Sequence, residues 1–302
     1  MFRNLLLDKN NKETLLFGNS GFPLFVGVNR LERFALGYVP WHWHHEMQFS
    51  VVTEGSVLFQ TQGEQYILSS GEGIFINSGF LHMAKPKSPD ATYICIDADT
   101  RLISSFPGSV IEEKYLHPFL GTERMAVIPL YPEEDWSLSI LNDLIDVYNA
   151  YKDKEFGFEL KISANLMIIW EGLLKSGIQS NGFQTCLDIN QRIMKDIITY
   201  IEDHYDEKVT LDDISKSIHL SKGECCRLFK RNAGITIFEY LIGYRIQKSA
   251  ELLAGSNMTI SQIASNVGFS NASYFTEIFK KHTNQTPSEY RLSNSKLNDA
   301  LA

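Results

Sequence analysis

The residues best suited to chemistry in this sequence are three histidines and a glutamine. His42, His44 and Gln48 lie in the stretch WHWHHEMQ, and His82 follows further along the chain. Alternation along a single extended strand predicts that His42, His44 and Gln48 share one face. Imidazole and amide groups can hydrogen-bond a polar small molecule, and imidazoles can also ligate a divalent metal.

Three interpretations of these four residues stay open. They can line a pocket and bind a small-molecule effector, which is the prediction that we adopt. They can instead satisfy one another within the core, or they can hold a catalytic metal. The metal has the weakest support, because the neutral amide of Gln48 is a poor ligand for a hard ion beside imidazoles. Glu46 is close by and can also turn inward, but we predict no metal and no cofactor.

A second group of chemically capable residues lies in the last third of the chain and suits contact with DNA. Arg227 can pair bidentately with a guanine edge, and Glu277 can accept from a cytosine amine. Side chains such as Lys280 bind phosphate, which fixes register without reading sequence. The predicted DNA-binding residues are Lys222, Gly223, Cys226, Arg227, Lys230, Arg231, Asn271, Ser273, Tyr274, Thr276, Glu277, Lys280, Lys281 and Thr286. The alternative for each of them is a solvated polar position on a helix.

Two similar helix pairs are predicted to carry these residues. In the second pair, Thr259 and Asn271 are predicted N-caps of two short helices, with a turn at Gly268 between them. Its apolar positions at helical spacing are Ile260, Ile263, Val267, Phe275, Ile278 and Phe279. The first pair repeats them 49 or 50 residues earlier, at Leu211, Ile214, Ile218, Cys225, Leu228 and Phe229. This repeat indicates two helix-turn-helix units, whose second helices lie in the DNA major groove.

The segment between the two units predicts one long helix, from about residue 235 to residue 253, with Gly255 as its stop. At 1.5 Å per residue it spans about 27 Å, of the same order as the roughly 34 Å repeat of B-DNA. One rigid helix of this length can hold two recognition helices in successive major grooves.

Over roughly residues 190–292 the chain resembles the AraC/XylS-type transcriptional regulators. The resemblance is carried by residues 228–230, Gly234, 240–241, Arg245, Ala250, 252–253, 263–264, 267–269, 273–275, 279–281, 286–287 and 290–291. Asn284 and Ser215 depart from the usual Gly and Ala of the family. The resemblance implies a DNA-binding transcriptional regulator with a small-molecule sensor domain. It also implies a homodimer and contact with RNA polymerase.

The first part of the chain has a different pattern. Between residues 33 and 99, short β-branched and aromatic runs alternate with glycine-containing turns, which is typical of a sandwich or barrel. The stretch at residues 41–48, with Gly71, Gly79 and His82, resembles the two cupin motifs, although Gln48 stands at the carboxylate position. Residues 133–175 predict two amphipathic helices. They resemble the dimerisation segment of the family, or else both pack on their own barrel.

The predicted fold is therefore α+β with two domains. A cupin-like β-barrel with two following helices occupies residues 1–175 and serves effector sensing and dimerisation. A linker rich in Ser, Gly, Gln and Asn occupies residues 176–188. An all-α domain of two helix-turn-helix units joined by a long helix occupies residues 189–292, and residues 293–302 form a tail.

Composition and charge are compatible with this organisation. The chain has 302 residues, of which 44% are hydrophobic and 21% charged, as in soluble globular proteins. No stretch approaches the roughly 20 apolar residues that span a bilayer. The net charge of −8 is uneven, since residues 1–188 hold 14 Lys+Arg and 23 Asp+Glu, whereas residues 189–302 hold 14 and 13. The four cysteines have no metal-ligand spacing.

We therefore predict a cytoplasmic, non-enzymatic regulator that binds double-stranded DNA under the control of a small molecule and does not bind a membrane. A sugar or sugar derivative is the effector class that the family resemblance suggests. Two alternatives stay open: a metal-dependent cupin enzyme fused to a DNA-binding domain, and a ligand-independent regulator with a vestigial pocket.

Overall fold

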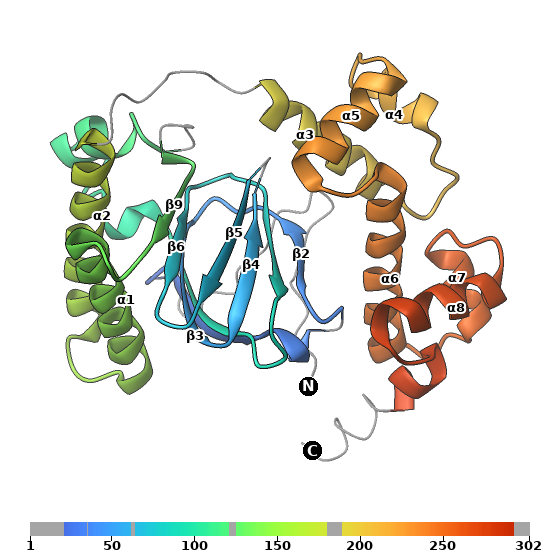
Figure 1. Ribbon diagram of the computed structural model, residues 1–302, viewed down its shortest axis with the longest axis horizontal. Coiled ribbons are helices and arrows are strands. Elements are labelled where there is room, and N and C mark those ends of the chain that lie inside the picture. Colours follow the sequence, from blue (N-terminus) through green and yellow to red (C-terminus); the bar gives the residue numbers. More distant parts are fainter. Residues whose placement is uncertain (1–20, 35, 62–63, 121–124, 180–188, 293–302) are drawn as a thin grey trace.

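The computed structural model describes residues 21–34, 36–61, 64–120, 125–179 and 189–292. The predicted tail and residues 180–188 of the predicted linker lie outside the described residues. In the described part, strands come first, two helices follow, and a group of shorter helices ends the chain (Figure 1). This order confirms the predicted α+β fold class.

The strands form two antiparallel sheets that face each other as a barrel (Figure 1). The five-stranded sheet has the order β1-β8-β3-β6-β9, and the four-stranded sheet has the order β2-β7-β4-β5. The bounds are β1 Leu24–Arg30, β2 Val39–His42, β3 Met47–Glu54, β4 Ser56–Gln60, β5 Gln65–Ser69, β6 Gly73–Ile76, β7 His82–Pro86, β8 Thr92–Ala98 and β9 Val127–Leu130. Short 3-10 helices at Leu31–Arg33 and Thr100–Leu102 and a π-helical segment at Ile111–Leu116 connect them.

Alternation along the strands separates the barrel interior from its outer surface. On β3, Val52 packs into the interior, whereas Phe49 and Val51 pack outward. The interior hydrophobic cluster includes Val57, Phe59, Leu68, Ile74, Ile76 and Tyr93. Side chains therefore fill much of the barrel, as they do in other small barrels.

Two long helices, α1 (Asp135–Asp153) and α2 (Phe158–Gln179), cover the outer face of the five-stranded sheet (Figure 1). Their buried residues, such as Leu144 and Ile169, share one core with Phe49 and Phe75 of the sheet. Both helices thus pack on their own barrel, which was one of the two predicted alternatives. Helix α2 extends to Gln179, so the predicted linker begins too early. Ser176 fits the helix because its hydroxyl donates to the carbonyl of Leu173.

The C-terminal helices form the two predicted helix-turn-helix units (Figure 1). Their bounds are α3 Ile189–Asp203, α4 Leu211–Ser217, α5 Lys222–Ala233, α6 Ile237–Gly255, α7 Ile260–Asn266 and α8 Ala272–Thr283. Ser221, Thr259 and Asn271 are N-caps of α5, α7 and α8. Gly268 has a φ of 82°, and a Cβ there would lie 2.5 Å from the Tyr205 carbonyl oxygen. The turn therefore requires glycine.

The helical domain packs directly on the barrel. Trp41 of β2 and Met83 of β7 belong to the same hydrophobic cluster as the buried residues of α3, α5 and α6. Figure 1 shows α6 alongside β2, away from α1 and α2. The 19 residues of α6 span about 28 Å and carry the second unit at their C-terminal end. No helix among the described residues is long and apolar enough to cross a bilayer.

Candidate DNA interface and buried histidine cluster

Four elements bring the predicted histidine cluster together. His42 ends β2, His44 lies in the connection to β3, Gln48 is the second residue of β3, and His82 begins β7. The prediction that one strand carries His42, His44 and Gln48 is wrong, because β2 stops at His42 and β3 begins at Met47. Strand pairing instead brings two of the residues together, since His42 lies opposite His82 in the four-stranded sheet.

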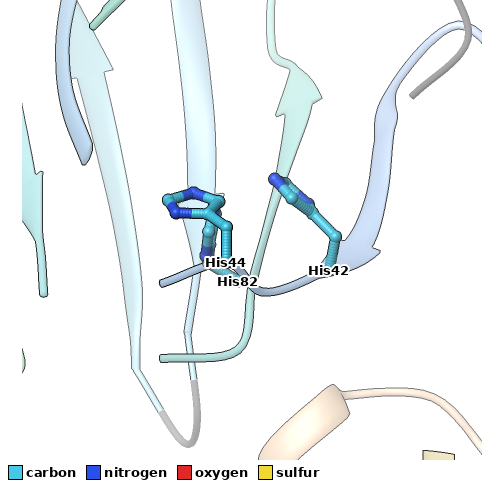
Figure 2. Close-up of side chains that lie close together, drawn as sticks. All are labelled: His42, His44 and His82. Atoms are coloured by element: carbon cyan, nitrogen blue, oxygen red, sulfur yellow. The ribbon is translucent and has the colours of Figure 1, made fainter. Parts of the chain in front are cut away.

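The three imidazoles converge inside the barrel (Figure 2). All three are buried, with exposed fractions of 3% or less. One nitrogen from each ring can be chosen so that all three lie within 4.8 Å of one another. The ring centroids of His42 and His82 are 4.1 Å apart. Such convergence of three nitrogen donors is the geometry of a metal or small polar ligand site.

Backbone carbonyl groups determine which nitrogen each ring presents. Nδ1 of His42 lies 2.8 Å from the Pro40 oxygen, and Nδ1 of His82 lies 2.8 Å from the Phe80 oxygen. Nδ1 of His44 lies 3.0 Å from the oxygen of Glu46. A carbonyl only accepts, so Nδ1 of His44 and of His82 carries the proton and Nε2 of these two rings keeps a lone pair. The ring of His42 has a second carbonyl partner, that of His82.

Gln48 lies between two of these lone pairs. Its Oε1 is 3.1 Å from Nε2 of His44 and 2.8 Å from Nε2 of His82, while its Nε2 is 3.1 Å from the Ser50 hydroxyl. An amide oxygen and an imidazole lone pair are both acceptors. Rotating the amide by about 180° lets its NH₂ group donate to both rings and its oxygen accept from Ser50. In that orientation Gln48 satisfies His44, His82 and Ser50 at once.

Burial keeps two of the rings neutral. It lowers the pKa of His42 to about 3, with a further contribution from His44. It also lowers the pKa of His82 well below its ordinary value, and the neighbouring histidines add to the effect. His82 therefore offers Nε2 as a base or ligand at neutral pH without first losing a proton.

The cluster fits a divalent transition metal. Imidazoles that are oriented by backbone carbonyl groups are a frequent donor set for such ions. The Glu46 carboxylate does not complete the set, because it lies 3.8 Å from Nδ1 of His44, on the protonated side of that ring. Gln48 is the side chain that lies next to the Nε2 atoms.

The predicted DNA-binding residues gather on the helices that the sequence suggested. Twelve of them are exposed on or beside α5 and α8, and Thr276 and Thr286 are half-buried. Each helix buries the equivalent aromatic position, Phe229 or Phe279, against its own unit. The polar positions of both helices therefore point away from the core.

Hydrogen bonds hold the first turns of α5 and α8 in place. The Ser221 hydroxyl accepts from the Glu224 amide at 3.2 Å. The Asn271 side chain accepts from the amides of Ser273 and Tyr274 at 2.8 and 3.1 Å. Asn271 thus already uses its oxygen as a helix cap.

Several of the predicted contacts are engaged within the protein. Lys222 pairs with Asp212 at 2.8 Å. Lys216, together with this Lys222 pairing, lowers the pKa of Asp212 to about 2. The Thr276 hydroxyl donates to the Ala272 carbonyl at 2.9 Å. Thr286 precedes the helical residues 287–292, and its amide donates to the Glu289 carboxylate at 2.8 Å.

The guanidinium of Arg227 lies back over the first turn of α5. A Cβ at Gly223 would lie 3.4 Å from its Nη1 atom. The absence of a side chain at Gly223 therefore leaves room for Arg227 to lie across the helix end or to swing outward.

One feature of the structure had no counterpart in the sequence prediction. Tyr274 and Lys281 line a cavity of about 530 Å³ between the barrel and the helices, together with Lys85 and His282. Tyr38 also lines it, and burial raises the pKa of Tyr38 to about 12. No sequence pattern links these residues, because they come from β7, α8 and the segment just before β2, far apart in the chain.

Several known proteins and protein families are similar to this chain. Residues 31–167 match the model of the AraC-like ligand binding domain, and residues 214–293 match a helix-turn-helix domain model. The chain is 33% identical over 294 residues to an uncharacterized HTH-type transcriptional regulator, YdeC, of Bacillus subtilis, covering 97% of this chain and all of that protein. It is 25% identical to the lactose operon transcription activator of Staphylococcus xylosus, covering 80% of this chain and 82% of that protein. A crystal structure of ToxT from Vibrio cholerae aligns with a TM-score of 0.45 and 17% identity, over 89% of this chain and 97% of that one.

A ligand-binding barrel joined to two helix-turn-helix units defines an effector-controlled, DNA-binding transcriptional regulator. The chain belongs to the AraC/XylS family of such regulators. The relatives that match over most of this chain are described as transcriptional regulators.

Proposed function

We propose that α5 and α8 are the two recognition helices and that Arg227 and Glu277 read bases. The observation that supports this proposal is the equivalent placement of the two helices. Each starts at a capped end, buries the equivalent aromatic residue and exposes its polar side. Arg227 pairs with a guanine and Glu277 with a cytosine amine.

Selection of genomic fragments by the purified protein, followed by a gel shift, tests this proposal. The wild type is expected to recover one shared motif. Arg227→Ala should weaken binding by about tenfold or more and relax the preference at one base pair. Arg101→Ala is the matched control, since Arg101 is exposed on the barrel and pairs with Asp99 at 2.8 Å. Equal binding by Arg227→Ala and the wild type would remove Arg227 from the base-reading role.

We propose that Lys230 and Lys280 bind phosphates. Both are exposed, each in the last turn of its recognition helix. Lys280→Ala should weaken binding to all sequences alike and reduce the slope of log affinity against log salt by about 1. A change in sequence preference would instead assign Lys280 to base reading.

The nature of the effector is also a proposal. We keep the prediction that His42, His44, Gln48 and His82 contact an effector, which must be very small because all four side chains are buried. A sugar-sized molecule has room in the cavity beside Tyr38, whose volume of about 530 Å³ is in the usual range for small-molecule sites. The similarity to a lactose operon activator supports a sugar. A thermal-shift screen of sugars, repeated with the Tyr38→Phe variant, tests whether the effector is a sugar. If no sugar stabilises the wild-type protein, the effector does not belong to this class.

We propose a homodimer formed through α2. This helix exposes Leu160 and Ile168, with exposed fractions of 78% and 53%. Light scattering on the purified protein should give a dimer, and Leu160→Asp with Ile168→Asp should give a monomer that still folds. Lys175→Asp, on the same helix, is the control. A wild-type monomer at micromolar concentration contradicts the proposal.

Contact with RNA polymerase and a cytoplasmic location remain predictions from the family resemblance. Transcription in vitro from a recovered site tests the first, and fractionation of cells tests the second.

A further inference from the structure

We propose that the cavity between the barrel and the helical domain binds a phosphorylated monosaccharide. Lys85 of β7 and Lys281 of α8 hold its phosphate group from two sides, and the aromatic walls of the cavity hold the sugar. The proposal rests on the sugar effector proposed above. It adds the charge that this effector carries and the two domains that the effector joins.

Three parts of the chain build the cavity. Strands β2 and β7, with the segment before β2, form the barrel side, while α6 and α8 form the helical side (Figure 1). The volume of about 530 Å³ has room for a monosaccharide phosphate. The aromatic side chains on the walls are Tyr38, Trp41, Tyr240, Tyr244 and Tyr274. Flat rings with polar edges suit a ligand that has both apolar C–H faces and hydroxyl groups.

Lys85 on the barrel side indicates that the ligand is an anion. Met83 and Lys85 alternate with Ala84 along β7, so both point out of the barrel toward the helices. Nζ of Lys85 lies 5.1 Å from the centre of the Tyr38 ring. Burial and the nearby Lys87 lower the pKa of Lys85, and no carboxylate among the described residues pairs with it. A half-buried ammonium group without an acidic partner is costly, and an anionic ligand removes this cost.

Two further basic side chains reach the cavity from α8. Lys281 is exposed and therefore lies at the opening, whereas His282 is half-buried. Burial lowers the pKa of His282, and the positive charges of Lys281 and Lys85 add to this effect. The ammonium groups of both domains are thus close enough to act on one imidazole. A phosphate between them neutralises both and accepts charge-assisted hydrogen bonds from each.

The carboxylate on the cavity wall does not balance these charges. Glu239 is the one acidic residue among the described residues that line the cavity. It accepts from the Thr236 amide at 2.7 Å and thereby caps the start of α6. In the part of the chain that the structure describes, no ion pair joins it to Lys85 or Lys281. The walls therefore keep an excess of positive charge.

Trp41 adds a hydrogen-bond donor that has no acceptor. Its side chain is 3% exposed, and within the described residues its indole nitrogen has no hydrogen-bond partner. Unsatisfied buried donors are rare in native proteins, and each needs an explanation. Since Trp41 lines the cavity, a small movement of its ring brings the N–H group to an oxygen of a bound ligand. A sugar phosphate is rich in such acceptors.

The position of the cavity predicts the effect of the ligand on DNA binding. Tyr274 and Lys281 line the cavity and are also predicted DNA-binding residues. Leu36 of the barrel domain packs in the hydrophobic cluster of the second helix-turn-helix unit. A phosphate that joins Lys85 to Lys281 strengthens this arrangement and engages a side chain that DNA also uses. The ligand therefore binds DNA-free protein more tightly, and by linkage it weakens DNA binding.

The screen of sugars described above, extended to their phosphate esters, tests the site on the full-length protein. The probes are glucose, fructose and ribose, their terminal phosphate esters, and inorganic phosphate, all in chloride buffers of equal ionic strength. At ~10 mM, at least one ester should raise the unfolding temperature by about 2 °C or more beyond its parent sugar and beyond inorganic phosphate. The proposal is overturned if no ester does so.

The pattern of a negative result separates this proposal from the one on which it rests. Equal stabilisation by a parent sugar and its ester keeps the sugar effector and overturns the phosphate site. Equal stabilisation by inorganic phosphate and by every ester shows an anion site without recognition of the sugar, which also overturns the proposed ligand.

Substitution of Lys85 identifies the site. Lys85→Met keeps the aliphatic stem and removes the ammonium group. It should lower the affinity for the stabilising ester by at least about tenfold. In chloride alone it should be at least as stable as the wild type, because an unpartnered charge is removed. Lys87→Met is the matched control, since Lys87 is exposed outside the cavity, and it should bind as the wild type does.

A second variant keeps the test valid if Lys85→Met fails to fold. Lys281→Met changes an exposed position of α8 and should also lose about tenfold in affinity for the ester. Wild-type affinity in the folded lysine variants overturns the proposal.

A gel shift on a recovered DNA site, with and without the stabilising ester at equal ionic strength, tests the regulatory part. DNA affinity should fall by about fivefold or more in the wild type and stay unchanged by the ester in Lys85→Met. Ester binding without this fall overturns the regulatory part. An absence of specific DNA binding under all conditions contradicts the proposed function instead, and the thermal unfolding data can still be read in that case.

Discussion

At the scale of single residues, local hydrogen bonds decide what each functional side chain can do. The carbonyl groups of Glu46 and Phe80 fix the tautomers of His44 and His82, whereas the ring of His42 has two carbonyl partners, those of Pro40 and His82. On α8, the Asn271 side chain accepts hydrogen bonds from two amide groups. It therefore has a structural role whether or not it contacts DNA. Residue type alone does not distinguish these tasks.

Asn271→Ala should lower the free energy of unfolding by about 1 kcal/mol, because two amides at the start of α8 lose their acceptor. Urea denaturation of the purified protein measures it. Asn271→Asp keeps an acceptor at the same place and should restore most of the loss. If both variants unfold like the wild type, the cap does not contribute to stability.

At the scale of elements, the same design is used twice. Each unit crosses a short helix over a recognition helix that buries an aromatic residue at the equivalent position, Phe229 or Phe279, and each helix begins with a capping side chain. In the second unit, the ring of Phe275 packs against those of Phe269 and Phe279 at centroid distances of 5.2 and 5.6 Å. This aromatic group holds α8 in its orientation.

Phe275→Ala should destabilise the protein by about 3–5 kcal/mol, since it opens a cavity in a fully buried aromatic cluster. Lys280→Ala, on the exposed side of the same helix, should stay within about 0.5 kcal/mol of the wild type. Chemical denaturation followed by circular dichroism compares the two. Similar stability losses for both would show that α8 is not held by its aromatic face.

At the scale of the whole molecule, the barrel and the helical domain share a hydrophobic cluster instead of meeting only through polar contacts. Trp41, Leu81 and Met83 of the barrel are nearly inaccessible because the helices cover them. The recognition helix α8 also borders the cavity between the domains. An effector that binds in this cavity or in the barrel can therefore act on DNA binding through α8 or through the shared hydrophobic cluster.

Met83→Asp should separate the two domains, because an unpaired charge in the shared cluster is costly to bury. We expect the single unfolding transition of the wild type to divide into two. Lys87→Asp, at an exposed position of the same segment, is the control and should keep one transition. Calorimetry provides the measurement, and a single transition in Met83→Asp contradicts the shared core.

The charges around the cavity predict a pH dependence. Burial, followed by Lys281 and Lys85, lowers the pKa of His282, while Glu239 is the acidic side chain on the same wall. The folded protein thus binds this proton less well than the unfolded chain does. Stability is complete above the ordinary histidine pKa of about 6.5 and should fall as the pH drops below it.

His282→Gln removes this contribution, so the variant should lose less stability than the wild type between about pH 7 and pH 5. Denaturation at several pH values measures the difference between the two slopes. His45→Gln, whose side chain is exposed, serves as the control. Identical slopes for the wild type and His282→Gln would contradict the assigned role.

The sequence by itself determined the helical domain. The spacing of Ile263, Phe275 and their counterparts, and the capping residues Thr259 and Asn271, depend on interactions within a few residues. Such interactions are visible in the order of the chain. The barrel could be predicted as a class from its short strands, and the four residues of the cluster could be named individually.

Only the tertiary structure decided how those four residues meet. Alternation suggested one strand for His42, His44 and Gln48, but the chain leaves the sheet after His42, and His82 joins through strand pairing. The cavity between β7 and α8 and the cluster around Met83 also had no pattern in the sequence. They are made by residues that are distant along the chain, and contacts of that kind are fixed by the packing of whole elements and not by local spacing.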